Sequence, residues 1–107
     1  MSSISTHVLD TTRGSPAAGI PVALDFQTAD QQWNPIGKSV TDSDGRVRSF
    51  AGGELIKGLY RLTFEVEAYQ QGFYPLIVLV FRVENPNENY HVPLLLGAFG
   101  YTTYRGS

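Results

Sequence analysis

The chain has 107 residues, with 8 Lys and Arg against 10 Asp and Glu, 2 His and no Cys. This length suits a single domain over residues 1–107, and a net charge of -2 without a basic cluster argues against nucleic acid or an anionic membrane as partners. The absence of Cys excludes disulfides, thiolate nucleophiles and Cys-ligated zinc, and 2 His are too few for a zinc site of their own, so no metal is expected.

The ends and the apolar runs bear on where the protein resides. Residues 1–7 lack the basic start and apolar run of a signal peptide, and the C-terminus is not of the Ser-Lys-Leu type. The longest apolar run, residues 75–81, is far shorter than the ~20 residues that cross a bilayer. We therefore expect a soluble cytoplasmic protein.

Turn-forming residues recur about every ten positions, which favours strands over helices. The expected turns are residues 11–16, 34–37, 42–45, 52–53, 70–72, 85–89 and 97–100. The only place for a helical turn is near Glu67 to Gln71. The pattern predicts an all-β, two-sheet sandwich of about seven or eight strands.

Within the expected strands, side chains alternate between two faces. In residues 4–10, Ile4, Thr6 and Val8 would face the core, which leaves Ser5, His7 and Leu9 on the other face. In residues 20–27 and 60–67 the even positions are large and apolar, as is typical of antiparallel strands with one face in water.

Residues 73–83 differ because both faces of this expected strand are apolar. A two-layer sandwich has little within one chain to cover the second face. Either a connecting loop or another subunit would cover that face, and we favour an interface with another subunit over a strand that is buried on both sides within the chain.

In residues 90–96 the even positions would face the core, so His91 shares the other face with Pro93 and Leu95. Both histidines therefore lie on faces that turn away from the core and are partly apolar. One such His is usually a surface residue with a pKa near 6.5 and no function, but two in the same setting favour a functional face.

The segment Asp42-Ser43-Asp44-Gly45 contains an Asp-Gly pair, which is typical of a hairpin turn. A calcium loop would need a third ligand and a closing Glu, and neither is present. Arg46 and Arg48 follow at the start of a strand, either as solvated cations or as a clamp for an anion or carbonyl. The tail, residues 100–107, has Thr and Tyr at strand-like spacing, which predicts a last strand that reaches the C-terminus.

Three segments carry a resemblance: Ser5-Thr6-His7-Val8-Leu9-Asp10, Asp44-Gly45-Arg46, and His91-Val92-Pro93-Leu94-Leu95-Leu96 with the closing Tyr101-Thr102-Thr103-Tyr104-Arg105-Gly106-Ser107. Together they resemble the transthyretin-related 5-hydroxyisourate hydrolases over the whole chain, and the terminal Tyr-Arg-Gly-Ser is specific to the enzymes. The carrier transthyretin shares the fold but lacks these His and Arg residues.

The resemblance implies a prealbumin-like sandwich of two four-stranded sheets, a homotetramer, no cofactor, and hydrolysis of 5-hydroxyisourate to 2-oxo-4-hydroxy-4-carboxy-5-ureidoimidazoline. It assigns catalysis to His7, Arg46 and His91, and substrate binding to Thr102, Tyr104, Arg105, Gly106 and Ser107, on a channel between two dimers. Asn89 stands where relatives often have His, and the connection at residues 68–72 is short, so their helix there is expected to be trimmed or missing.

Hydrolysis of a cyclic acyl-urea bond needs a base near pKa 7, a cation for the developing oxyanion and a proton donor for the leaving nitrogen. Two His and an Arg supply these parts, although the sequence does not say which His is the base. Two alternatives are a transthyretin-like carrier of an aromatic ligand and a module that serves only to oligomerise. Neither accounts for the three segments together.

Overall fold

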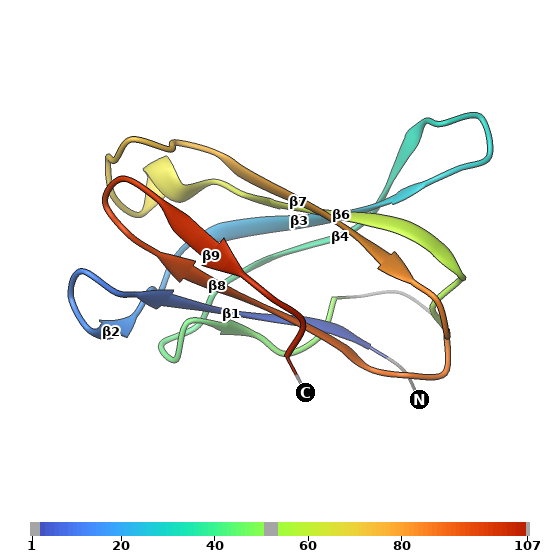
Figure 1. The fold of residues 1–107 in the computed structure, drawn as a ribbon, viewed down its shortest axis with the longest axis horizontal. Helices are drawn as coiled ribbons and strands as arrows, with labels where there is room; N and C mark the ends of the chain where they lie inside the picture. The colour runs from blue at the N-terminus through green and yellow to red at the C-terminus, as the bar shows by residue number, and fades with distance from the viewer. Residues whose placement is uncertain (1–2, 51–53, 107) are drawn as a thin grey trace.

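The computed structural model describes residues 3–50 and 54–106 and shows two β-sheets packed face to face (Figure 1). In these residues the strands are β1 (Ile4–Asp10), β2 (Ser15–Pro16), β3 (Pro21–Gln27), β4 (Trp33–Val40), β5 (Arg46–Val47), β6 (Gly58–Phe64), β7 (Ile77–Val83), β8 (Tyr90–Leu96) and β9 (Tyr101–Thr103). One turn of 3-10 helix, η1 (Val66–Ala68), precedes β7. The all-β sandwich with a trimmed helix is confirmed. The turn expected at residues 52–53 and the residue Ser107 lie outside the described residues.

One sheet has the strand order β2-β1-β8-β9, with β5 also paired to β1, and the other has the order β4-β3-β6-β7. β1 and β8 run parallel, and each of the two short strands pairs antiparallel with β1. Because β8 occupies one edge of β1, β2 and β5 share its other edge at different positions. The two-residue strand β2 enlarges this sheet beyond the four strands that the resemblance implied.

The core between the sheets follows the alternation that the sequence predicted. On β1 the residues Ile4, Thr6 and Val8 are buried, and on β8 the even positions are buried likewise. The largest fully buried side chains are Phe64, Ile4, Ile20, Leu24, Leu62, Ile77 and Leu94. Burial of such side chains stabilises the fold by about 1.5–3 kcal/mol each. The outward faces of β1 and β8 are thereby set by the same alternation.

The expected strand at residues 73–83 starts later than predicted, at Ile77. Pro75 has no N–H for a sheet ladder, and its carbonyl instead accepts a hydrogen bond from Glu67. Ile77, Leu79 and Val83 face the core, while Val78 and Val80 are 44% and 54% exposed. The described residues therefore leave the second face of β7 uncovered, and the interface remains a prediction.

The turn predicted at residues 34–37 is wrong, because these residues lie within β4. The register against β3 shifts between Leu24 and Asp25, where Gly37 and Pro35 are the partners and Ile36 is the extra residue of a β-bulge. β4 is at the edge of its sheet, where a Pro is tolerated. A bulge thus explains the turn-forming composition of this strand.

Within the described part of the chain, no helix has the length and apolar character needed to span a bilayer.

Candidate functional site

The outward face of the sheet that contains β1, β5 and β8 brings together the histidines and Arg46. Ser5 is the register partner of His91 in the parallel β1–β8 pair, and His7 is the partner of Pro93. On the other edge of β1, His7 is the register partner of Arg46 on β5. Register partners have side chains on the same face of a sheet. Three strands therefore place His7, Arg46 and His91 side by side.

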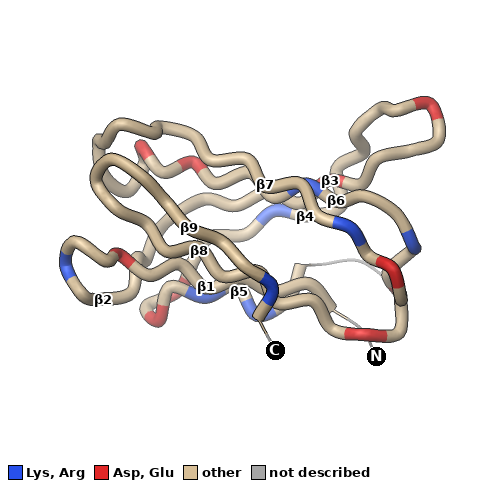
Figure 2. The backbone as a smooth tube through the Cα atoms, in the orientation of Figure 1, with Lys and Arg blue, Asp and Glu red and all other residues tan. Residues whose placement is uncertain are grey.

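A pocket of about 120 Å³ opens on this face and is lined by Ser5, Thr6, Arg46, Val47, Arg48 and His91. His7 lies next to it, between Arg46 and Pro93 in register, but does not line it. Basic residues lie beside β5 in Figure 2, so the pocket offers positive charge to a ligand. In the described residues, no group of three His, Cys, Asp or Glu could hold a metal ion.

A tight turn fixes the position of Arg46. The Asp42 carboxylate accepts hydrogen bonds from the backbone N–H groups of Asp44 and Arg46, at 2.9 and 3.0 Å. Gly45 has φ +76, and a Cβ there would lie 2.4 Å from the Val8 carbonyl oxygen. Glycine is therefore required. The predicted turn is present, but it carries the chain from β4 in one sheet to β5 in the other, so the two strands do not form a hairpin.

His91 is half-buried, and its environment favours a neutral ring. Its Nδ1 lies 2.9 Å from the Ser5 hydroxyl oxygen. Burial lowers the pKa of His91 below its usual value, and the neighbouring charges of Arg46 and His7 lower it further. A neutral imidazole with one free nitrogen can accept a proton from water.

The C-terminal segment runs along β8 and contacts His91. Thr102 is the register partner of Leu95, which puts it on the face that carries His91. Beyond β9, the Gly106 N–H donates a 2.7 Å hydrogen bond to the carbonyl of His91. A Cβ at Gly106 would lie 2.6 Å from the ring carbon Cδ2 of His91, so only glycine fits against the ring.

Tyr104 and Arg105 lie elsewhere. Both line a groove of about 310 Å³ at the edge of the sandwich, between β7 and β9. The Arg105 guanidinium donates to Glu88 at 3.1 Å and stacks 4.4 Å from the ring centre of Tyr90. Within a single chain, these two side chains are therefore apart from the pocket beside His91.

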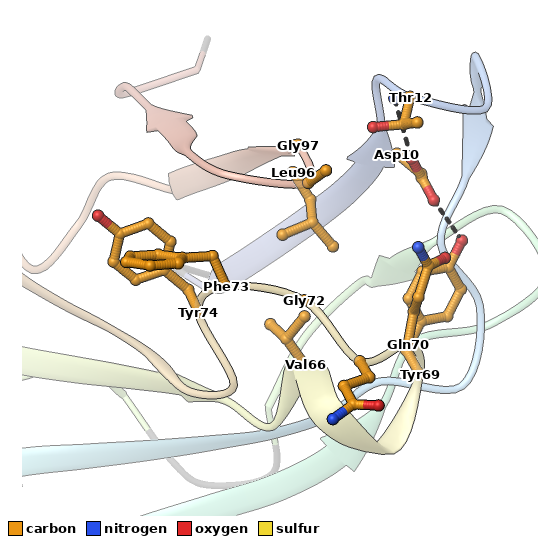
Figure 3. Close-up of a pocket in the computed structure, with 12 residues that line it drawn as sticks. Asp10, Thr12, Val66, Tyr69, Gln70, Gly72, Phe73, Tyr74, Leu96 and Gly97 are labelled. Atoms are coloured by element: carbon orange, nitrogen blue, oxygen red, sulfur yellow. Dashed lines mark hydrogen bonds between the residues drawn. The ribbon is translucent and has the colours of Figure 1, made fainter.

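A third and smaller cavity, of about 20 Å³, lies where the end of β1, the η1 turn and the loop before β9 meet (Figure 3). Tyr69 donates a 2.7 Å hydrogen bond to Asp10, whose other oxygen accepts from the backbone of Thr12 and Arg13. Burial alone would raise the pKa of Asp10, but these hydrogen bonds outweigh it, and the pKa is lowered. The Asp10 carboxylate is thus engaged in tying the η1 turn to β1.

The pocket also contains residues to which the resemblance gave no role, and Ser5 and Arg48 are two polar ones among them, each in contact with another polar group. The alternation put Ser5 on the face of His7, but its contact with His91 depends on the parallel register of β1 and β8. Arg48 lines the pocket with Arg46, although it is more exposed and lies 3.6 Å from the Asp44 carboxylate. The sequence offered both Arg residues as a clamp for an anion or carbonyl, and the resemblance assigned a role only to Arg46.

This fold and pocket define a transthyretin-like sandwich with a polar, cationic site suited to hydrolysis. The chain belongs to the HIUase/Transthyretin family, whose model matches residues 4–106. The 5-hydroxyisourate hydrolase of Mus musculus is 42% identical over 113 residues, which are 99% of this chain and 96% of the relative.

Two solved structures extend the comparison. The 5-hydroxyisourate hydrolase of Klebsiella pneumoniae superposes with a TM-score of 0.86 and 31% identity over 100% of both chains. Sea bream transthyretin in complex with thyroxine gives a TM-score of 0.89 and 28% identity over 97% of this chain and 94% of that one. The relatives near 40% identity over the whole chain are hydrolases, and the chain is an enzyme of that class.

Proposed function

We propose that the protein hydrolyses 5-hydroxyisourate to 2-oxo-4-hydroxy-4-carboxy-5-ureidoimidazoline in urate degradation, without a cofactor. The observation that carries this proposal is the convergence of His7, Arg46 and His91 from three strands on one face. The names of the mouse and Klebsiella relatives supply the substrate.

In the proposed reaction, one His takes a proton from water while the water oxygen bonds to the ring carbonyl carbon. Arg46 stabilises the oxyanion that forms, since guanidinium donors fit carbonyl and carboxylate oxygens. The carbon–nitrogen bond then breaks, the proton passes to the leaving nitrogen, and the product carries a new carboxylate. Thr102, Gly106 and Ser107 are proposed to complete the substrate site, and Tyr104 and Arg105, which lie apart from the pocket within a single chain, are proposed to join it in the assembled oligomer.

The test is to generate 5-hydroxyisourate freshly from urate and to follow its ultraviolet decay with and without the protein. We expect decay well above the spontaneous rate, with a first product that matches the carboxy-ureidoimidazoline by NMR. Decay at the spontaneous rate with folded protein would contradict the proposal.

A carrier of an aromatic ligand is the second candidate, because sea bream transthyretin binds thyroxine on a similar fold. A carrier needs an apolar channel, whereas the pocket here is lined by two Arg and a His. Calorimetry with thyroxine, run beside the decay assay, distinguishes a carrier from a hydrolase.

The cytoplasmic location of the protein stays a prediction, and cell fractionation tests it.

We further propose that the active form is a homotetramer. One edge of the sandwich carries exposed apolar side chains, which are Val78 and Val80 on β7, Phe99 in the loop before β9 and Tyr101 at the start of β9. Light scattering at micromolar concentration should give four times the chain mass, and specific interfaces of this kind bury well over ~1,000 Å². A monomer mass together with full activity would contradict this assembly.

The tail gives a further prediction. Gly106→Ala should lower turnover about 10- to 100-fold, because the added methyl would collide with the ring of His91 and displace it. Gly100→Ala is the matched control, since a Cβ there meets no atom within 4 Å. Equal activity of both variants would show that the position of the tail is unimportant.

A further inference from the structure

The contact between Ser5 and His91 is built into the sheet. The two residues are register partners in the parallel β1–β8 pair, so the 2.9 Å distance between Ser5 Oγ and His91 Nδ1 is set by two central strands. Among the described residues, the side-chain hydrogen bond recorded for each of them is with the other. The sheet thus gives Nδ1 of His91 a fixed partner.

The same arrangement leaves one ring nitrogen of His91 without a hydrogen-bond partner among the described residues. Ser5 holds Nδ1, and Gly106 packs against the Cδ2 side of the ring. The remaining nitrogen, Nε2, is therefore the one open to a ligand in the pocket, which His91 lines together with Ser5, Arg46 and Arg48.

The chemistry of the pocket favours a lone pair on Nε2. A guanidinium carries only donors, so an N–H on Nε2 would add another donor to a pocket that Arg46 and Arg48 already line with N–H groups and positive charge. A lone pair there faces the cations favourably, and the ring proton then lies on Nδ1, where the Ser5 oxygen can accept it.

We propose that Ser5 is a positioning residue that accepts the hydrogen bond from Nδ1 of His91 and so leaves Nε2 unprotonated as the base that activates water. This inference rests on the proposed hydrolase function and assigns the base to His91 instead of His7. When Nε2 takes the proton from water, the bond from Nδ1 to Ser5 strengthens because its donor is now charged.

Two variants of Ser5 whose new side chains have the same shape test the contribution of its hydroxyl. Ser5→Thr keeps it and Ser5→Val replaces it by a methyl, and both β-branched residues suit a strand. We expect Ser5→Val to lower kcat about 10- to 100-fold with little change in KM, and Ser5→Thr to retain most of the activity. Equal kcat values for the two variants would overturn the proposal.

The pH profile gives a readout that a merely structural role would not move. Among residues 3–50 and 54–106, the charged or titratable groups beside His91 are His7 on β1 and Arg46 and Arg48 on β5, and all are unchanged in these variants. Loss of an acceptor that stabilises the imidazolium should lower the pKa of His91 and shift the acid limb of kcat/KM to lower pH. A shift to higher pH in Ser5→Val would contradict the proposal.

The ¹⁵N chemical shifts of His91 report its tautomer directly, without substrate and without any variant. At a pH where the ring is neutral, we expect Nδ1 to be protonated in the wild-type protein and this bias to weaken in Ser5→Val. A wild-type ring protonated on Nε2 would overturn the role of Ser5. Because this measurement is independent of turnover, failure of the hydrolase assay would overturn the proposed function separately.

Discussion

His91→Ala is expected to reduce kcat for 5-hydroxyisourate by ~10²- to 10⁴-fold, the usual loss when a proton-transfer group is removed. The ring is half-buried, and its pKa is lowered by burial and by the charges of Arg46 and His7, so it is available as a neutral base. Steady-state kinetics on the fresh substrate measure the effect. Thermal unfolding should change little, because the side chain faces away from the core.

His7→Ala is the matched variant, and we expect a loss in the same range from the other proton-transfer step. Added imidazole should partly restore activity to either variant, because it replaces the missing proton-transfer group but could not correct a structural defect. Wild-type turnover in both variants would refute the assigned roles. A loss of turnover in His91→Ala that imidazole does not relieve would point to packing against Gly106 instead.

The core strands were predictable because the alternation of apolar and polar side chains along each of them allows only one face to be buried. On β1, β3, β6 and β8 a shift by one residue would expose a whole row of apolar side chains, so the buried face could be read from the sequence. Edge strands have no such constraint. β4 tolerates Pro35 and a bulge at Ile36, and this composition was mistaken for a turn.

The sequence could predict on which strand face each site residue lies, but not which of these residues contact one another. Alternation put His7 and His91 on outward faces, and the Asp-Gly pair predicted the turn before Arg46. Which residues meet depends on the parallel register of β1 and β8 and on the pairing of β5 with β1, and both connect segments that are far apart in the chain. The contact of Ser5 with His91 is a consequence of that register.

Arg46→Glu is expected to depress kcat by at least the ~10²- to 10³-fold that accompanies loss of one oxyanion donor. The sandwich should tolerate the change, because the turn is held by Asp42 and Gly45 and its hydrogen bonds use only the backbone N–H and carbonyl of Arg46. A carboxylate at this position would repel the developing oxyanion. It would also reverse a charge that lowers the pKa of His91, so the acid limb of kcat/KM should move to higher pH.

Arg48→Glu is the internal control, since Arg48 also lines the pocket but is 69% exposed and lies 3.6 Å from Asp44. An exposed charge is screened by water, so this reversal should have a much smaller effect on kcat. Arg46→Lys keeps the charge but loses the planar fork, and an intermediate activity would show that geometry contributes beyond charge. If Arg48→Glu is as damaging as Arg46→Glu, the effect is general electrostatics of the pocket, and the specific role of Arg46 must be withdrawn.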